Sequence, residues 1–265
     1  MYKGKTIWIT GASSGIGEAL AYEFARRGAK LILSARRPDE LERVKATAGT
    51  YGNGPDDILV LPLDVTDEAQ IATATAQAKA FTGSIDMLIN NAGISQRSLC
   101  VDTDMATYRK LFEVDVFGQI ALTKEVLPIM LAQGSGHMVV TASVAGKIGV
   151  KQRTGYCAAK HAMMGFFDAL RAEVEDSGIQ VSTITPGFIR TNIATHALKG
   201  DGSEFGKVDK NIAGGMDVVE CAKVIMKGLE RGKREIPVGD GPEMKALLVK
   251  RFFPNTLFKM VRKMG

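Results

Sequence analysis

The sequence predicts a doubly wound α/β fold, in which a parallel sheet is covered by helices on both faces. Apolar segments rich in Val, Ile and Leu recur along the chain, and stretches with helical periodicity separate them. Continuous apolar strands that alternate with helices are typical of a parallel sheet buried on both sides. Right-handed crossovers between such strands place a ligand at the carboxyl ends of the strands.

Seven segments are expected to be strands, at residues 6–10, 30–35, 58–64, 87–92, 137–143, 180–186 and, more weakly, 234–239. Helices are expected near residues 15–28, 39–48, 67–81, 104–133, 153–177 and 217–231. No Pro/Gly/Ser linker or internal repeat divides the chain. Residues 1–241 are therefore expected to form one domain, and residues 242–265 a C-terminal tail.

A glycine-rich turn joins the first strand to the first helix. It has the spacing Gly-x-x-x-Gly-x-Gly, and its residues include Gly11, Ser13, Ser14, Gly15, Ile16 and Gly17. Glycines permit a tight turn and a close ligand, while a helix N-terminus directs free N–H groups at an anion. The turn is therefore a candidate phosphate cradle, and an ordinary β–α turn is the alternative.

The carboxyl ends of the first six strands carry small, polar or charged residues. In chain order these positions are Thr10 and Gly11, Ala35 and Arg36, Leu63 and Asp64, Asn90 and Asn91, Ala142 and Ser143, and Thr185 and Pro186. The carboxyl ends of parallel strands meet at one edge of a sheet. These positions are therefore expected to share one site.

Tyr156 and Lys160 lie four residues apart in a stretch expected to be helical. Residues at i and i+4 share one face of a helix, so the phenol and the ammonium can meet. A neighbouring cation favours the phenolate, which makes Tyr156 a candidate proton donor or acceptor at working pH. Ser143 lies thirteen positions upstream of Tyr156, at the end of an expected strand.

The composition fits an enzyme of a reducing compartment. Three cysteines form no pairing or metal pattern and three histidines lack ligand spacing, so neither a disulfide nor a metal site is expected. The chain starts directly with a strand and has no apolar run of about 18 residues, so a cytoplasmic location is expected. Residues 243–265 carry six basic residues and one acidic residue, which equals the whole formal charge of +5, so nucleic-acid binding is not expected.

In the order and spacing of its motifs, the chain resembles the short-chain dehydrogenase/reductase family in its single-domain form. The motifs are Thr10 to Gly17, Leu63-Asp64-Val65, Asn90-Asn91-Ala92-Gly93, Ser143, Tyr156 with Lys160, and Pro186-Gly187. The resemblance covers residues 6 to about 192 and implies a Rossmann fold with seven strands in the order 3-2-1-4-5-6-7. It also implies hydride exchange between a nicotinamide cofactor and a carbonyl or alcohol.

The resemblance implies roles for four catalytic residues. Ser143 is expected to bind the substrate oxygen, Tyr156 to pass the proton, and Lys160 to favour the phenolate and hold the nicotinamide ribose. Asp115 stands where the family usually has Asn, which completes a proton relay from the lysine. An ionised Asp only accepts hydrogen bonds, so we expect activity with an altered pH optimum; a solvated helix carboxylate is the alternative.

The same resemblance implies that the cofactor is held by Gly11, Ser13, Ser14, Gly15, Ile16, Gly17, Arg36, Asp64, Val65, Asn90, Ala92, Gly93, Tyr156, Lys160, Pro186, Gly187, Ile189 and Thr191. An NAD enzyme commonly has an acidic residue after the second strand, where this chain has Ala35. Arg36 follows and can pair with a 2′-phosphate, so NADP(H) is expected. A solvated surface pair with Arg37 is the alternative.

The expected substrate contacts are Ser143, Tyr156, Ile94, Val144 and Phe188. Residues 192–216 are rich in Gly and polar groups and are expected to form the substrate lid that the family has here. A small or medium apolar ketone, aldehyde, steroid-like or acyl compound is favoured over a sugar. The resemblance also implies a homodimer or homotetramer that packs through the helices at 104–133 and 153–177.

In the tail, apolar residues alternate with six basic ones, and Pro254 is expected to separate two short helices. An exposed basic amphipathic helix indicates peripheral contact with a membrane surface. Alternatively, the apolar face closes the active-site mouth or a subunit interface while Lys and Arg reach water. A catalytically weak NADP(H)-binding regulator and a membrane-surface adaptor are the alternatives to a reductase.

Overall fold

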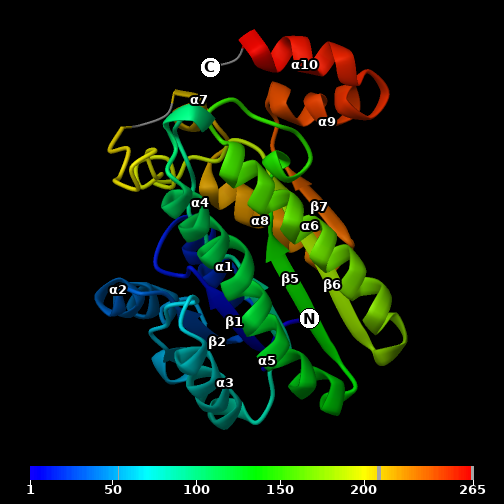
Figure 1. Cartoon of the computed structure of the whole chain (residues 1–265). Helices are drawn as coiled ribbons and strands as arrows, with labels where there is room; N and C mark the ends of the chain where they lie inside the picture. Colours follow the sequence, from blue (N-terminus) through cyan, green and yellow to red (C-terminus); the bar gives the residue numbers. More distant parts are fainter. Residues whose placement is uncertain (53, 208–209, 264–265) are drawn as a thin grey trace.

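Seven parallel strands form the centre of the structure, a computed structural model that describes residues 1–52, 54–207 and 210–263. The strands are β1 (Thr6–Thr10), β2 (Lys30–Ser34), β3 (Ile58–Val60), β4 (Met87–Asn90), β5 (Gly136–Thr141), β6 (Ile179–Pro186) and β7 (Glu235–Val238). Their order in the sheet is β3-β2-β1-β4-β5-β6-β7, which confirms the predicted doubly wound fold (Figure 1).

The helices that connect the strands are α1 (Gly15–Ala25), α2 (Pro38–Ala48), α3 (Glu68–Thr82), α4 (Met105–Phe112), α5 (Gly118–Gln133), α6 (Thr154–Val174), α7 (Lys210–Ala213) and α8 (Val218–Glu230). Short 3-10 turns occur at η1 (Pro55–Asp57), η2 (Cys100–Asp102), η4 (Val144–Gly146) and η5 (Glu175–Ser177). The last two helices are α9 (Pro242–Phe252) and α10 (Pro254–Lys263). Residues 208–209 of the expected lid and 264–265 of the expected tail lie outside the described residues.

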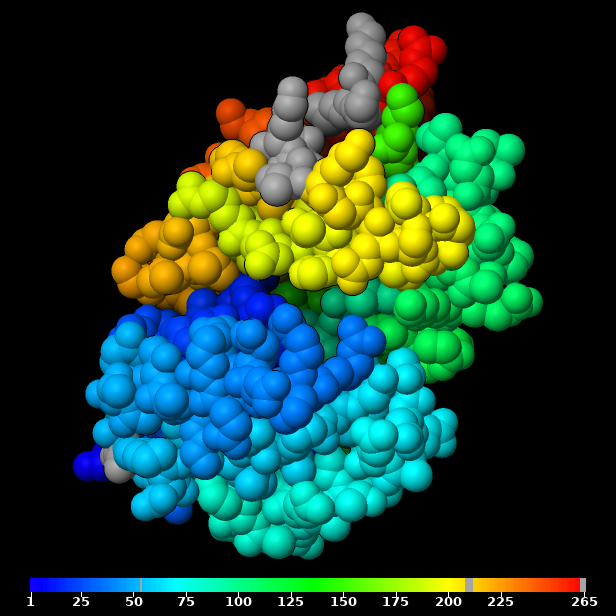
Figure 2. All heavy atoms as spheres, turned by 90° about the vertical axis from the view of Figure 1, so that its left-hand side faces the viewer, coloured from blue at the N-terminus to red at the C-terminus, as the bar shows by residue number. Residues whose placement is uncertain are grey.

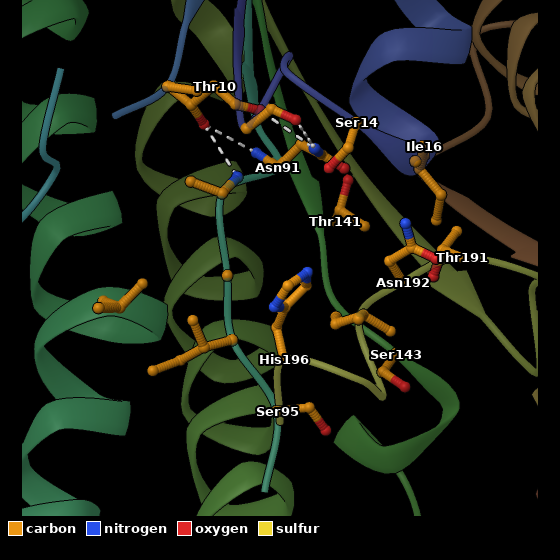
Figure 3. A pocket seen from close by; sticks show the side chains of 18 of the residues that line it. Thr10, Ser14, Ile16, Asn91, Ser95, Thr141, Ser143, Thr191, Asn192 and His196 are labelled. Carbon is orange, nitrogen blue, oxygen red and sulfur yellow. Dashed lines mark hydrogen bonds between the residues drawn. The ribbon is translucent and has the colours of Figure 1, made fainter. Parts of the chain in front are cut away.

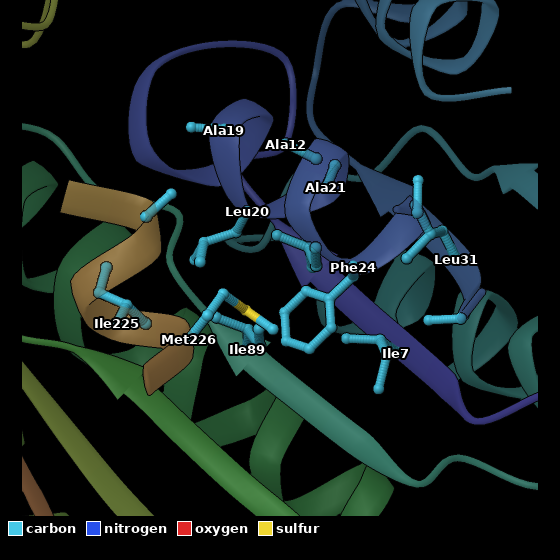
Figure 4. Packing of buried hydrophobic residues seen from close by; sticks show 14 of the residues in the cluster. Ile7, Ala12, Ala19, Leu20, Ala21, Phe24, Leu31, Ile89, Ile225 and Met226 are labelled. Atoms are coloured by element: carbon cyan, nitrogen blue, oxygen red, sulfur yellow. The ribbon is translucent and has the colours of Figure 1, made fainter. Parts of the chain in front are cut away.

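Each face of the sheet has its own hydrophobic core, because successive strand residues point to opposite faces. Ile7 of β1 packs into the cluster formed with α1, α2 and α8, whereas Trp8 packs into the cluster formed with α3, α5 and α6. Figure 4 shows Phe24 of α1 and Met226 of α8 meeting above Ile7 and Ile89 of the sheet. Burial of a side chain such as Phe24 contributes about 1.5–3 kcal/mol, so these layers hold the strand ends in fixed positions.

Two expected elements differ in the structure. The third strand ends at Val60 rather than residue 64, although the Leu61 and Leu63 N–H groups still donate to the Leu33 and Ala35 carbonyls at 2.9 and 3.0 Å. The expected helix over 104–133 is divided into α4 and α5 by one π-helical turn, η3 (Glu113–Phe117). Such turns occur often at functional sites, and this one contains the buried Asp115.

The tail forms two helices that meet at Phe253 and Pro254, as the proline predicts. Its apolar face packs on the η4 turn, where Ala246 and Leu257 contact the cluster that contains Val144. The acidic residue Glu243 accepts a hydrogen bond from the Phe188 amide (3.1 Å), at the end of β6. In the part of the chain that the structure describes, no helix is long and apolar enough to cross a membrane.

Candidate functional site

A cavity of about 530 Å³ lies at the carboxyl edge of the sheet. Figure 2 shows its side of the molecule, where a hollow separates the N-terminal residues in blue from the yellow segment around residue 200. Strands β1, β2, β5 and β6 and the loops after β1 to β6 contribute lining residues, so these strand ends and loops border one cavity. A volume of this size is typical of pockets that bind a small molecule or cofactor.

The glycine positions of the turn leave little room for a larger residue. Gly11 and Gly15 have φ values of +63° and +60°, which favour glycine. A Cβ on Gly17 would lie 2.3 Å from the Gly11 carbonyl oxygen. Ser14 precedes α1, but its side chain makes no capping hydrogen bond, so the first N–H groups of the helix face the cavity without a side-chain partner.

Asn91 fixes the turn to the end of β4 (Figure 3). Its Nδ2 donates to the Thr10 and Gly11 carbonyl oxygens at 3.1 and 3.4 Å. In return, the Thr10 hydroxyl accepts from the backbone N–H groups of Asn91 and Ala92 at 3.0 and 3.1 Å. These four bonds hold the loop after β4 beside the turn after β1, although the two are about 80 positions apart in the sequence.

Ser143, Tyr156 and Lys160 line the same cavity as the glycine-rich turn. Tyr156 and Lys160 both come from α6, and the Lys160 ammonium lies 5.7 Å from the centre of the Tyr156 ring. Ser143 follows β5, and its Oγ accepts from the Ala145 N–H at 3.1 Å and donates to the Pro186 carbonyl at 3.4 Å. The spacing of four residues along α6 brings Tyr156 and Lys160 together, and the position of β5 in the sheet brings Ser143 to them.

Lys160 is buried beside Asp115, with Nζ 3.5 Å from Oδ2, and Nζ also donates to the Thr141 carbonyl at 3.3 Å. Burial lowers the pKa of Lys160, but the charges of Asp115 and Tyr156 raise it more, and the net direction is upward. Burial raises the pKa of Asp115 against the opposing effects of Lys160 and of the Ile94 N–H, which donates to Oδ1 at 2.7 Å. Asp115 therefore keeps Lys160 protonated without itself facing the cavity.

Two arginines after β2 lie at the far end of the cavity. Arg36 and Arg37 are both exposed lining residues, and Arg37 Nη2 donates to the Ser13 hydroxyl at 3.2 Å. Asp64 also lines the cavity, and its Oδ1 accepts from the Thr66 amide and hydroxyl at 3.0 and 2.8 Å. This end of the cavity is therefore a cationic pocket with one fixed carboxylate beside it.

The other end of the cavity mixes apolar and polar walls. Its apolar residues include Ile94, Phe188, Ile189, Ile193, Leu198 and Ile212. Ser95, Asn192 and His196 add polar groups (Figure 3). Several of these residues belong to the segment 192–216, which therefore covers this end of the cavity over its described residues. Among the residues described, no three His, Cys, Asp or Glu side chains are grouped to hold a metal ion.

Most of the site residues predicted from the sequence line the cavity, and four do not. The four are Gly17, Asn90, Asp115 and Val144. Gly17 packs the helix on the turn, and Val144 packs on the tail. Asn90, the last residue of β4, is fully buried and donates to the Thr123 hydroxyl (2.9 Å), because alternate strand residues face opposite sides of the sheet.

Several lining residues are not predicted by the sequence. Asn91 belongs to a predicted motif without a predicted contact, and no local pattern indicates Ser95, Asn192 or His196. The sequence leaves Arg37 as a surface neighbour of Arg36, whereas the structure bonds it to the glycine-rich turn. The alternation of side chains along β4 could have favoured Asn91 over Asn90. Asn192 and His196, which belong to the segment 192–216, reach the cavity only through the tertiary fold.

The chain belongs to the short-chain dehydrogenases, since the model of the short chain dehydrogenase family matches residues 5–201. Members exchange a hydride with a nicotinamide cofactor, which places the chain among the oxidoreductases. A human relative, Dehydrogenase/reductase SDR family member 7, is 41% identical over 261 residues, which are 98% of this chain and 77% of the relative.

Solved structures of short-chain dehydrogenases are similar to this chain in fold. Levodione reductase is 29% identical, has a TM-score of 0.82 and is matched over 92% of this chain and 99% of its own. A short-chain dehydrogenase/reductase from Burkholderia phymatum in complex with NAD has a TM-score of 0.83, with 98% of this chain and 95% of that chain covered. At 23% identity, this second likeness shows the fold alone.

Proposed function

We propose that this protein is an NADP(H)-dependent oxidoreductase that interconverts a carbonyl and an alcohol, with Tyr156 as the general acid and base. One observation carries the proposal: Ser143, Tyr156 and Lys160 line the same cavity as an uncapped, glycine-rich helix start. The first group of residues can manage a proton, and the second can hold a phosphate. A dinucleotide bound along the cavity would contact both groups, with its pyrophosphate at the start of α1 and its nicotinamide near Tyr156.

The residues present fit a nicotinamide dinucleotide. The N–H groups at the start of α1 face the cavity without a cap, as a pyrophosphate requires. We propose that Lys160 and Tyr156 hold the nicotinamide ribose and that Asp64 and Val65 contact the adenine, and all four residues line the cavity. When bound, the nicotinamide supplies or takes the hydride; the chain supplies orientation and proton transfer.

In the proposed reaction, the Ser143 hydroxyl donates a hydrogen bond to the substrate oxygen and positions it beside Tyr156. Tyr156 gives a proton to that oxygen during reduction and takes it back during oxidation. The protonated Lys160 stabilises the phenolate that remains, because a nearby cation favours the charged form. Asp115 acts through Lys160, as its carboxylate holds the ammonium at 3.5 Å.

The Tyr156→Phe variant tests this role. It removes the only transferable proton of the ring but keeps its volume, so we expect kcat to fall about 100- to 10,000-fold. Carbonyl reduction is followed by NADPH absorbance, and cofactor binding by NADPH fluorescence. Retained cofactor binding with lost turnover supports the proposal. Unchanged turnover in this variant would exclude Tyr156 as the proton donor.

The preference for NADP(H) is proposed from the charge after β2. Arg36 and Arg37 line the cavity where the chain has no acidic residue at position 35, and a guanidinium pairs well with a phosphate. We expect Arg36→Ala with Arg37→Ala to lower kcat/KM for NADPH about 10- to 100-fold, and to change kcat/KM for NADH little. Lys79→Ala, an exposed cation on α3, is the control. A wild-type preference for NADH would contradict the assignment.

We propose that the substrate is a small or medium carbonyl compound with an apolar body. We also propose that the protein assembles as a homodimer or homotetramer. Ile94, Phe188 and Ile212 support the apolar body, since they line the cavity that also contains Ser143. A panel of ketones, aldehydes and sugars of equal size, assayed with NADPH, tests the class; faster turnover of the sugars would contradict it. Light scattering on the purified protein tests for the homodimer or homotetramer.

A further inference from the structure

The C-terminal hairpin, residues 242–263, exposes large apolar side chains on the outside of the molecule. Leu248 is 66% exposed, Phe252 68%, Phe253 65% and Phe258 56%. Leu248 and Phe252 are one helical turn apart, so they share the solvent face of α9, and Phe253 lies at the turn into α10. An exposed apolar surface with a polar rim marks an interaction site.

The charges around these side chains are of one sign. Lys245, Arg251, Lys259 and Arg262 are exposed on the hairpin. Its acidic residue, Glu243, is turned inward, where Oε1 accepts from the Phe188 amide at 3.1 Å and the carboxylate packs on Gly187. The outer surface of the described hairpin is therefore apolar and cationic, with no carboxylate side chain facing outward.

A small basic cavity lies where the hairpin meets the body of the protein. It has a volume of about 390 Å³ and is lined by Lys147, His161, Leu247, Lys250 and Arg251. Lys147 also forms an ion pair with Glu235, and the Lys250 ammonium lies 4.6 Å from the centre of the Phe258 ring. The cavity thus places cationic groups directly beside an exposed aromatic side chain, as one lipid headgroup and its acyl chains would require.

We propose that the C-terminal hairpin docks on an anionic phospholipid bilayer. Leu248, Phe252, Phe253 and Phe258 enter the interface between headgroups and acyl chains, the surrounding Lys and Arg side chains contact the headgroups, and the basic cavity receives one headgroup phosphate. A second copy of the chain fits this surface poorly, because a two-fold contact would bring cationic faces together.

The hairpin is fixed to the site end of the molecule. Ala246 and Leu257 pack with Val144 and Ile148 beside Ser143, and Glu243 bonds to the loop after β6. In Figure 1, α9 and α10 lie at the same end of the molecule as α7 and the segment around it. A bilayer bound to the hairpin therefore lies at the end where the substrate lid is, and not at the opposite, amino-terminal edge of the sheet.

Vesicle flotation of the full chain tests the proposal without any assay of turnover, so its result is independent of the proposed function. We expect the protein to float with vesicles of phosphatidylcholine and phosphatidylserine and to remain unbound with phosphatidylcholine alone. Lys250→Gln with Arg251→Gln should weaken partitioning roughly 20- to 30-fold, since each cation near an anionic surface contributes to binding. Phe252→Ser with Phe253→Ser should weaken it about tenfold or more.

Two matched variants carry the same chemical changes elsewhere. Lys227→Gln with Arg231→Gln removes two exposed cations, and Leu131→Ser with Val224→Ser removes two exposed apolar groups. Both should float like the wild type, and all variants should keep the wild-type circular dichroism spectrum. Absence of flotation with both lipids would overturn the proposal, whether or not calorimetry shows binding of inorganic phosphate, and so would equal losses in the matched variants. So would dissociation of an oligomer by Phe252→Ser with Phe253→Ser, which would assign this face to a subunit contact.

Discussion

At the scale of single residues, Lys160 connects three groups of the site. It lies 3.5 Å from Asp115, donates to the Thr141 carbonyl at 3.3 Å, and faces the Tyr156 ring. A Cβ on Gly93 would lie 3.3 Å from its Nζ and 3.2 Å from Asp115 Oδ1, so the pair is closely enclosed. In such a dry environment the charge of Asp115 acts strongly on Lys160.

Asp115→Asn should shift the pH dependence of turnover. The charge of Asp115 raises the pKa of Lys160, so its removal lowers that pKa and Lys160 loses its proton at a lower pH. If the protonated amine is required, the alkaline limb of the kcat profile moves to lower pH. Asn can still accept from the Ile94 N–H, which keeps the local structure.

The control for this variant is Glu113→Gln, which changes an exposed carboxylate in the same π-helical turn. Its profile should match that of the wild type. Coinciding pH–rate profiles for Asp115→Asn and the wild type would remove Asp115 from any part in proton transfer. Loss of activity at all pH values in Asp115→Asn, with lost cofactor binding, would instead indicate a structural role.

At the scale of elements, the packing of α1 on β1 depends on Gly17. A Cβ there would lie 2.3 Å from the Gly11 carbonyl oxygen and 2.7 Å from the Asn91 amide nitrogen. Neither atom can move freely, because the first belongs to the backbone and the second donates to Thr10. The glycine therefore sets the distance between helix and sheet, and with it the position of the N–H groups that face the cavity.

Gly17→Ala should destabilise the protein by about 1–3 kcal/mol, as overpacking does, and should weaken cofactor binding. Gly165→Ala is the matched control, since a Cβ at this position of α6 meets nothing within 4 Å. It should stabilise the helix by up to about 1 kcal/mol. Urea unfolding and NADPH titration measure both effects, and equal stability of the two variants would contradict the packing argument.

At the scale of the whole molecule, a buried histidine joins the last three strands of the sheet. His137 on β5 bonds through Nε2 to the Ser182 hydroxyl on β6 (2.8 Å), which donates to the Lys233 carbonyl just before β7 (2.7 Å). Because Ser182 already donates, His137 serves as the donor to it. Burial lowers the pKa of His137 from 6.5 to about 4, since the interior disfavours the charged ring.

Folding should therefore become less favourable in acid. Between pH 6.5 and about 4 the unfolded chain binds a proton at His137 that the folded protein does not, so stability falls as the pH is lowered through this range. The full effect is up to about 3 kcal/mol, since each unit of pKa difference corresponds to roughly 1.4 kcal/mol. Urea unfolding at pH 7 and pH 5 measures the part of this loss that occurs above pH 5, about 2 kcal/mol.

His137→Gln should reduce the difference in unfolding free energy between the two pH values, because glutamine does not titrate there. His196→Gln serves as the control, since His196 is exposed in the segment 192–216 and its side chain is 57% accessible. If His137→Gln loses as much stability between pH 7 and pH 5 as the wild type, another group causes the acid sensitivity.

Several features were determined by the sequence itself. Tyr156 and Lys160 share a face because four residues make about one helical turn, and the strand, glycine turn and helix around Gly11 follow from local composition. The order of the strands followed from the motifs of the family, and the structure confirms it. These relations depend on neighbours in the chain, or on a topology with few alternatives.

Only the tertiary structure decided the rest. It selected Asn91 over Asn90 for the cavity, placed Asp115 behind Lys160, and brought Arg37 to Ser13. It also turned Glu243 inward to the Phe188 amide, which left the outer face of the hairpin, over its described residues, without a carboxylate side chain. Each of these contacts joins residues 24 or more positions apart or depends on which face of an element is buried, and local sequence patterns do not encode such distances.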